Sequence, residues 1–298
     1  MAKEKTSKLI KKENLKAFPL ITTIILTLYA LTLIIPLIWT VISSLKTASD
    51  FGLHPLELPR KWRFDGYVKA WTALYVPVEA GSGTREVRLV EMFGNSLFLS
   101  IVCVFTAEIS RVMCAYTAAK FRHHKVMVIM HQIVVILMIV ALPSSLASTI
   151  RWRKTLGLYD SMIGEAIVNI GFTGINFLYY YSSFKGVSTG YMEAARIDGA
   201  GEYRIFFGIM FPMIRNTFMA LFILSFITNW NNYEISLTLW PSHPVVAYGL
   251  YRFKSNREAS TVPLQLAACT LVIIPTLTLF LLFKNKLIGN LALGGMKG

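Results

Sequence analysis

The sequence is short of charge. Only 15% of its 298 residues are Asp, Glu, Lys or Arg, whereas soluble domains carry about 25%. Apolar residues make up 54%, and the mean hydropathy is +0.53. With 3 cysteines and 19 glycines, a disulfide-built secreted fold and a collagen-like fold are excluded, and the apolar content excludes a disordered chain. The composition disfavours a soluble enzyme and favours a protein with several membrane-spanning helices.

Acidic residues are scarce as well, with 16 Asp and Glu against 30 Lys and Arg. A basic soluble protein would suggest a nucleic-acid partner, but membrane proteins concentrate Lys and Arg in their cytoplasmic loops. The apolar content favours the membrane, so no nucleic-acid partner is expected. The three cysteines all lie in apolar stretches, where we expect packing residues and neither a disulfide nor a metal site. They are Cys103, Cys114 and Cys269.

Catalytic and nucleotide-binding patterns are missing. There is no GxxxxGK[ST] loop, which excludes ATP binding by the usual phosphate-binding loop. No Ser/His/Asp, Cys/His or paired-carboxylate arrangement stands out. We therefore expect a chain that is not itself an enzyme and that holds no metal or cofactor.

Six apolar runs are each near the roughly 20 residues that a helix needs to cross the hydrocarbon core. They cover residues 18–42, 92–119, 126–150, 163–184, 216–233 and 262–283. The runs are continuously apolar and do not alternate, which favours helices over barrel strands. The first run is too long for the apolar part of a signal peptide, so we expect it to be retained. The sequence thus predicts an all-α membrane protein with six transmembrane helices.

Six lysines precede the first run. They predict that the N-terminus lies in the cytoplasm, because Lys and Arg favour the cytoplasmic side. We expect a basic cytoplasmic N-terminus at 1–17 and a transmembrane domain at 18–283. Residues 46–90 would form an outer segment and residues 185–212 a cytoplasmic loop. Residues 284–298 would form a cytoplasmic tail. The lysines are Lys3, Lys5, Lys8, Lys11, Lys12 and Lys16.

The predicted outer segments are also basic, at Arg151, Arg153, Lys154, Arg252, Lys254 and Arg257 among others. One hypothesis is that they attract an anionic glycan or an acidic binding protein. The other is that they reach lipid phosphates or pair with nearby acidic residues. We favour the second.

The loop at 185–212 carries the most specific pattern. The run Asp198-Gly199-Ala200-Gly201 predicts a corner between two short helices, because glycine reaches backbone conformations that other residues avoid. Pro212 is predicted to mark the start of the next span, where its missing N–H costs nothing.

The same loop resembles the EAA signature of ABC importer permeases. The matching residues are Glu193-Ala194-Ala195, Gly199, Ile209, Phe211 and Pro212. The longer run EAARIDGA at 193–200 is similar to the carbohydrate-importer branch with maltose-type permeases. One departure is Phe211, where the family usually has Leu.

The resemblance implies the type I ABC importer permease fold and a short cytoplasmic helix that docks in a cleft of a separate ATPase. We refer to residues 185–212 as the coupling segment. Small residues allow close approach, Glu193 would pair with a basic residue of the ATPase, and Asp198 would cap the corner. The predicted ATPase-coupling residues are Glu193, Ala194, Ala195, Asp198, Gly199 and Ala200.

The resemblance also implies the rest of the complex. The partners would be a second permease subunit, two ATPase subunits and an extracellular or periplasmic solute-binding protein. The ATPase would bind ATP and Mg²⁺.

Asn229, Trp230 and Asn231 end the fifth run and resemble a Trp-Asn-rich stretch in sugar permeases. Amides suit sugar hydroxyls and a ring suits the C–H face of a sugar, so we predict a place in the substrate path. An aromatic belt at the membrane boundary explains the same residues equally well.

Two ionisable positions lie inside apolar runs. Glu108 and Arg111 are three apart, hence on one helical face, where they can neutralise each other. A brace between helices is favoured over a direct functional role. For His131, a packing role is favoured over a proton relay.

Together these patterns predict a permease subunit of an importer that moves a sugar or oligosaccharide across the cytoplasmic membrane by alternating access. The alternatives are an ABC permease for a non-sugar solute, an ion-coupled secondary transporter and an intramembrane enzyme. A secondary transporter should show internal repeats, which are not seen, and an intramembrane enzyme lacks a catalytic set.

Overall fold

The computed structural model describes residues 2–80, 83–122, 124–139, 146–171, 173–255 and 261–291, with side chains in these ranges except at 2–17, 80, 138–139 and 283–291. Arg257, which the sequence analysis places in an outer segment, and the last residues of the predicted tail, 292–298, lie outside the described residues. The chain divides into two compact units, one of residues 1–71 and 257–271 and one of residues 72–256 and 272–298.

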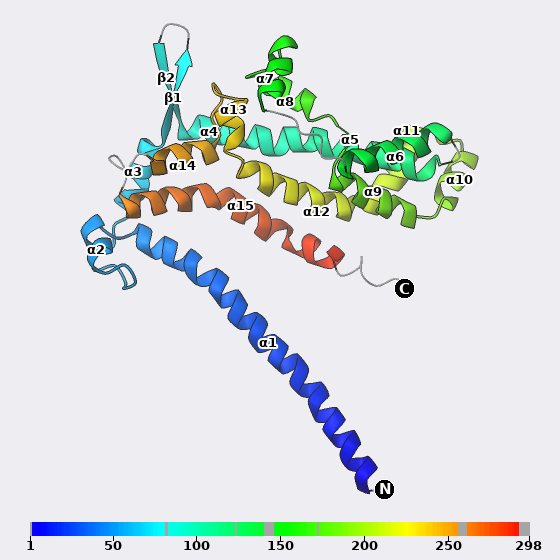
Figure 1. Cartoon of the computed structure of the whole chain (residues 1–298), viewed down its shortest axis with the longest axis horizontal. Coiled ribbons are helices and arrows are strands. Elements are labelled where there is room, and N and C mark those ends of the chain that lie inside the picture. Colours follow the sequence, from blue (N-terminus) through cyan, green and yellow to red (C-terminus); the bar gives the residue numbers. More distant parts are fainter. Residues whose placement is uncertain are drawn as a thin grey trace. The chain divides into compact units, whose positions relative to one another are not determined.

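The elements succeed one another along the chain as shown in Figure 1. They are α1 (Ala2–Ser44), α2 (Ala48–Leu53), α3 (Asp65–Ala73), β1 (Tyr75–Ala80), β2 (Gly83–Arg88), α4 (Leu89–Leu97), η1 (Phe98–Cys103), α5 (Val104–Lys120), α6 (Lys125–Ile139), α7 (Leu146–Thr155), α8 (Met162–Val168), α9 (Ile175–Gly186), α10 (Gly190–Ile197), α11 (Glu202–Ile205), η2 (Phe206–Met210), α12 (Phe211–Trp230), α13 (Glu234–Thr238), α14 (Val246–Ser255) and α15 (Val262–Leu291).

Four helices in the described ranges are long and apolar enough to cross a membrane. They are Phe18–Ser44, Leu89–Lys120, Glu202–Trp230 and Val262–Leu282. The predicted helical membrane class is confirmed, and these helices contain or overlap the first, second, fifth and sixth predicted runs. In the described residues, the six predicted runs do not all form uninterrupted helices. The third run includes α6 and the start of α7. Residues 140–145, between these two helices, lie outside the described ranges.

The predicted fourth span, 163–184, is divided in two. It forms α8 and α9, and the connection between them contains Gly174 with a φ of 115°. This backbone conformation is open to glycine and rare for other residues, so the helix cannot continue through it. Apolar residues flank the break on both sides, and hydropathy alone therefore did not reveal it.

The predicted fifth span begins earlier than expected. The sequence predicted a start at Pro212, but the helix runs without interruption from Glu202 to Trp230. The π-helical segment η2 comes just before the proline, and the N–H of Phe211 donates to the carbonyl of Phe206, five residues back. Such a wide turn shifts the hydrogen-bond pattern, so the missing N–H of Pro212 does not break the helix.

The predicted outer segment, 46–90, contains an antiparallel hairpin that the sequence analysis missed. β1 pairs with β2 so that Tyr75 lies opposite Arg88 and Ala80 opposite Gly83. Val76 and Val78 are buried while their neighbours are exposed, which is the alternation of a strand with one covered face. That alternation next to a Gly-Ser-Gly stretch is the signal that could have predicted it.

In the first unit, the chain after α1 is held by its own polar groups. The buried ammonium of Lys46 donates to the carbonyls of His54 and Pro55, at 2.8 and 3.0 Å. On α3, hydrogen bonds from Arg63 and Lys69 lower the pKa of the exposed Asp65 carboxyl well below its ordinary value. Such exposed pairs add little stability.

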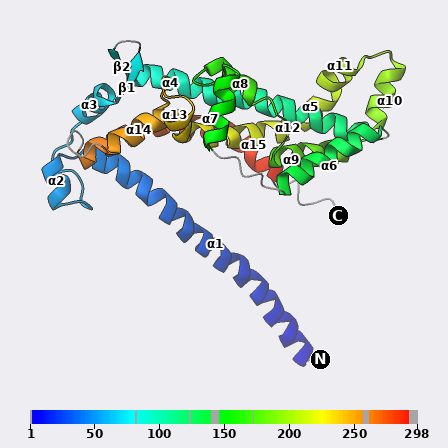
Figure 2. The same ribbon diagram turned by 45° about the horizontal axis from the view of Figure 1, so that its top comes forward.

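In the second unit, α4, η1 and α5 form one long helix that α9 and α12 pack against. Figure 1 and Figure 2 both place the β1–β2 hairpin at one end of this unit and α10 with α11 at the other. Aromatic rings fill the core near α10 and α11. The ring of Tyr116 lies 5.0 Å from that of Phe206 and 5.4 Å from that of Phe184. Aromatic packing of this kind makes the base of the coupling segment rigid.

Candidate functional site: a coupling helix and a polar cavity

The coupling segment turns a sharp corner after α10. Gly199 has a φ of 77°, the Gly199 N–H donates to the Arg196 carbonyl, and the Ala200 N–H donates to the Ala195 carbonyl at 2.9 Å. This pair of bonds is a Schellman motif, in which a glycine in the left-handed region ends the helix. The predicted glycine corner is confirmed. The predicted second short helix is not a separate element, because the chain beyond the corner enters the long helix that continues through α12.

One face of α10 is anchored to the rest of the unit. Met192 and Ala195 are buried, and the hydroxyl of Tyr116 donates to the sulfur of Met192 at 3.9 Å. Just before α10, the ammonium of Lys120 donates to the carbonyl of Val187. The buried face of α10 therefore packs against α5 through Met192 and Tyr116.

The other face of α10 is open. Glu193, Ala194 and Asp198 are exposed, and the side chain of Ile197 is 87% exposed. Across the corner, Tyr203 is 78% exposed. An acidic group, a small residue and two large apolar side chains on one open turn are typical of a protein-binding surface.

The structure brings the six predicted coupling residues together within one turn and its corner, but they do not share one environment. Ala195 faces the core and Ala200 is half-buried, whereas the other four are exposed. Across the corner, Arg196 pairs with Glu202 at 2.8 Å. These assignments of coupling residues remain predictions.

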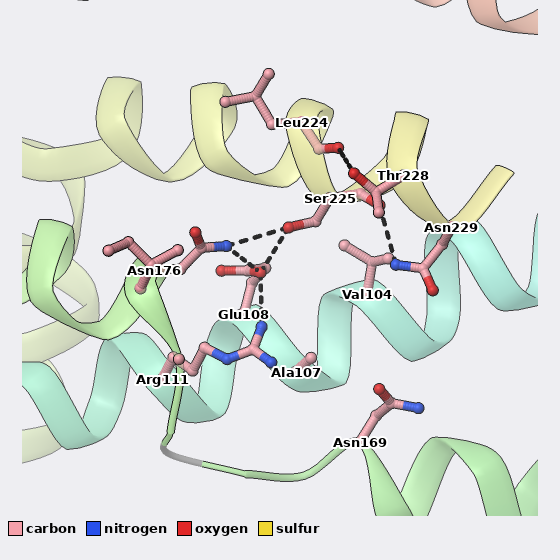
Figure 3. A pocket seen from close by; sticks show the side chains of 12 residues that line it. Val104, Ala107, Glu108, Arg111, Asn169, Asn176, Leu224, Ser225, Thr228 and Asn229 are labelled. Carbon is pink, nitrogen blue, oxygen red and sulfur yellow. Dashed lines mark hydrogen bonds and ion pairs between the residues drawn. The ribbon is translucent and has the colours of Figure 1, made fainter. Parts of the chain in front are cut away.

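A cavity of about 320 Å³ opens among α5, α9 and α12 and the connection between α8 and α9 (Figure 3). We call it the Glu108 cavity. Its lining residues are Val104, Ala107, Glu108, Arg111, Asn169, Gly174, Ile175, Asn176, Leu224, Ser225, Thr228 and Asn229.

Glu108 is the centre of this cavity's hydrogen bonds, and its side chain is 0% exposed. One carboxylate oxygen accepts from Arg111 at 2.8 Å, from Asn176 at 2.8 Å and from Ser225 at 2.9 Å. The other accepts from the hydroxyl of Tyr180 at 2.8 Å. Figure 3 shows the first three converging from α5, α9 and α12. A buried carboxylate needs such compensation, because desolvation without partners is costly.

The guanidinium of Arg111 has two partners. Besides its bond to Glu108, its Nε donates to the Thr173 carbonyl at 3.0 Å. That carbonyl lies directly before Gly174, at the break between α8 and α9. The predicted contact between Glu108 and Arg111 is confirmed. The pair also holds the break in place, which the sequence did not indicate.

A second buried ion pair lies behind the cavity. Arg153 of α7 pairs with Glu165 of α8, and both are buried. The other oxygen of Glu165 accepts from the amide of Asn169 at 2.8 Å. The basic residue Arg153, expected in an outer loop, is thus paired with an acidic neighbour, as the favoured hypothesis for these charges requires.

The three predicted path residues are placed differently from one another. Asn229 lines the Glu108 cavity, and its amide donates to the Ser225 carbonyl at 3.0 Å. Trp230 is 1% exposed, and its indole N–H donates to the Val272 carbonyl at 3.2 Å. Asn231 is exposed at the end of α12. In this structure Trp230 is a packing residue, so the structure places only Asn229 in the cavity.

Five polar residues of the site were missed by the sequence analysis. They are Asn169, Asn176, Tyr180, Ser225 and Thr228. Asn176 and Ser225 are polar residues inside apolar runs, and such residues face a protein interior or a water-filled cavity. That signal was present in the sequence, but the identity of their partner was not.

His131 stacks on Tyr181, with ring centroids 4.2 Å apart. This contact is consistent with the packing role that was favoured. Within the described ranges, no group of three or more His, Cys, Asp or Glu side chains is arranged to hold a metal ion.

Long apolar helices, a cavity with polar groups among three of the helices and a short helix with one exposed face fit a membrane transport subunit. Residues 111–288 match the family described as the binding-protein-dependent transport system inner membrane component. The chain belongs to this family. Its members are membrane-embedded transport subunits and not enzymes.

Similar proteins agree with this assignment. The chain is 26% identical over 289 residues to the diacetylchitobiose uptake system permease protein NgcG of Streptomyces coelicolor, covering 94% of this chain and 89% of that protein. It is 24% identical over 279 residues to the probable starch degradation products transport system permease protein AmyC of Thermoanaerobacterium thermosulfurigenes, covering 90% and 95%.

Among solved structures, the chain resembles a subunit of a bacterial ABC transporter involved in the import of the acidic polysaccharide alginate. The TM-score is 0.75 at 20% identity, over 91% of this chain and 96% of that one. At this identity the match establishes the fold, which is that of an ABC importer permease.

Proposed function

We propose that this chain is a transmembrane permease subunit of an ATP-driven importer for a sugar or oligosaccharide. The names of the two relatives support the solute class. The observation that carries the coupling part is the geometry of α10. Its buried face is fixed to α5, and its open face carries Glu193, Ala194, Asp198 and Ile197.

In this proposal, the open face of α10 docks in a cleft of an ATPase subunit that binds ATP and Mg²⁺. Glu193 pairs with a basic side chain of the ATPase, and the Gly199 corner keeps α10 at a fixed angle to the long helix beyond it. When two ATPase subunits close, they pull the coupling helices of two permease subunits together. A rigid-body movement of this kind opens the path to one side of the membrane at a time.

The proposed orientation puts the N-terminus, α10 and the C-terminal tail in the cytoplasm. The β1–β2 hairpin and residues 46–90 then face outside, where a solute-binding protein delivers the solute. The separation of the hairpin and α10 at opposite ends of the second unit supports this arrangement (Figure 2). We assign Asn229 to the path, whereas Asn231, exposed at the end of α12, lies outside the cavity and is not assigned to it.

The experiment is to reconstitute the chain with its partner permease, ATPase and solute-binding protein and to measure ATPase stimulation with a panel of saccharides. Stimulation by any saccharide that the binding protein carries supports the carbohydrate proposal. Stimulation only by a non-sugar solute would leave the importer in place and overturn the sugar assignment. Absence of a stable complex with any ATPase would overturn the coupling proposal.

A further inference from the structure

The Glu108 cavity contains three asparagine amides, and the protein uses the nitrogen of each. The amide nitrogen of Asn176 donates to Glu108 and, at 3.1 Å, to Ser225. That of Asn169 donates to the Glu165 carboxylate and, at 2.9 Å, to the Glu165 carbonyl. That of Asn229 donates to the Ser225 carbonyl. Each nitrogen lies against oxygens that accept its hydrogens. The nitrogen end and the oxygen end of each amide can therefore be told apart.

The side-chain oxygens of these three amides are not used in this way in the described part of the chain. In the described part of the chain, no hydrogen bond engages the side-chain oxygen of Asn169, Asn176 or Asn229. Thr228 adds a fourth acceptor, because its hydroxyl hydrogen is directed to the Leu224 carbonyl at 3.0 Å. In Figure 3, these amides and the hydroxyl project from the elements around the cavity. The lining therefore offers neutral hydrogen-bond acceptors, which can accept from water or from the donors of a solute.

The charges of the cavity cancel. Glu108 is paired with Arg111, and Glu165 behind Asn169 is paired with Arg153. The Glu108 carboxylate already accepts from four donors, three on one oxygen and one on the other, and its side chain is 0% exposed, so it offers a solute little access. A guanidinium has five N–H groups, and two of those on Arg111 have partners in the described residues. Arg111 therefore remains a donor toward the cavity, while its charge is balanced by Glu108.

This pattern discriminates between solutes. A carboxylate would meet several unprotonated oxygens and only one balanced cation, so it would lose its hydration without gaining a matching partner. A hydroxyl both donates and accepts, so it satisfies an amide oxygen and Arg111 together. Val104, Ile175 and Leu224 supply apolar contacts for C–H groups.

We propose that the Glu108 cavity is a binding subsite for a neutral, hydroxyl-rich saccharide unit. Its hydroxyls donate to the oxygens of Asn169, Asn176 and Asn229 and accept from Arg111. Glu108 and Glu165 are positioning residues that orient two of these amides. The volume, about 320 Å³, lies at the lower end of the range of small-molecule sites, which fits part of an oligosaccharide. This inference rests on the proposed carbohydrate function and makes it more specific.

The test uses the whole reconstituted transporter with a fixed amount of binding protein, and uptake is measured as the concentration of each probe is varied. The probes are neutral trisaccharides built from glucose, arabinose or N-acetylglucosamine, the matching uronate trisaccharides, and monodeoxy analogues of the best neutral probe. Asn229→Leu removes one acceptor, and since the Asn229 amide bonds only to its own helix, folding should be preserved. Asn231→Leu is the matched control, because the Asn231 amide makes the same kind of bond to Ile227, at 2.8 Å, outside the cavity lining.

We expect uptake of neutral probes in preference to uronates. Asn229→Leu should raise KM about fivefold, the size of one neutral hydrogen bond, with kcat within twofold, while Asn231→Leu leaves both within twofold. One monodeoxy analogue should raise KM for the natural sequence and cause no further rise in Asn229→Leu, which a merely structural role would not produce.

Preference for uronates, or an equal effect of the two substitutions on KM, would overturn the neutral subsite while leaving the carbohydrate function intact. Failure of every saccharide to support uptake would instead remove the proposed function and the subsite with it.

Discussion

The coupling segment and the Glu108 cavity differ in how far apart along the chain their parts lie. The α10 helix and its corner occupy residues 190–201, and their backbone hydrogen bonds join residues no more than five positions apart. The cavity joins Glu108 to Asn176, 68 positions away, and to Ser225, 117 positions away. One is a local motif with an exposed face, and the other exists only when several long helices are packed together.

The difference predicts how each responds to substitution. A local motif on the surface can lose a side chain and remain folded, because water replaces the lost partner. A buried network cannot, because the remaining partners stay desolvated. Substitutions in the cavity should therefore affect stability first, and substitutions on the open face of α10 should affect coupling first.

The largest effect is expected for Glu108→Ala. It leaves the Arg111 charge without its counterion and three other donors without an acceptor. Removing one partner of a buried pair costs about 3–5 kcal/mol, so the thermal unfolding temperature of the purified complex should fall sharply. Glu108→Gln keeps some of the hydrogen bonds and should recover part of the loss. Equal stability of Glu108→Ala and the natural sequence would show that the network does not hold the helices together.

A smaller effect on stability and a clear effect on coupling are expected for Gly199→Ala. A side chain at a φ of 77° costs about 1–2 kcal/mol, so the corner should shift and solute-stimulated ATPase activity should fall. Gly201→Ala is the matched control, because Gly201 has a φ of −72° and a Cβ there would meet nothing within 4 Å. If both variants lose the same amount of solute-stimulated ATPase activity, the backbone conformation of Gly199 does not explain the loss.

Glu193→Ala should change coupling without changing stability. The side chain is exposed, and its proposed partner lies on the ATPase. Losing one charge-assisted hydrogen bond should weaken the apparent affinity of ATPase for permease about tenfold, which titration of the ATPase against permease in detergent would measure. Unchanged affinity together with normal stimulated activity would contradict the assignment of Glu193 to the docking face.

The smallest effect is expected for Arg196→Ala. Arg196 and Glu202 are both substantially exposed, and exposed pairs contribute about 0–1 kcal/mol. The unfolding temperature should therefore change little, and Glu202→Ala should match it. A loss as large as that of Glu108→Ala would remove the distinction between the local motif and the buried network.

Sequence reasoning predicted the features that depend on neighbouring residues. The long apolar runs indicated the membrane class, and the run at 198–201 indicated the corner at Gly199. It placed Glu108 and Arg111 on one helical face, where they do pair. It failed where a run of apolar residues hides a break, as at Gly174, and where a helix continues through a proline, as at Pro212. Hydropathy measures an average over a window, and it does not respond to a single φ angle or to one shifted hydrogen bond.

Hydropathy and a glycine corner are properties of contiguous residues, so the amino-acid sequence was enough to establish a helical membrane protein with a corner at Gly199. The packing of the helices determined which polar side chains contact one another. That packing buried Trp230, placed Asn229 in the cavity and turned three amide nitrogens toward protein acceptors. The partner of a buried polar group depends on which helices lie against each other, and residues far apart in the chain carry no local mark of that contact.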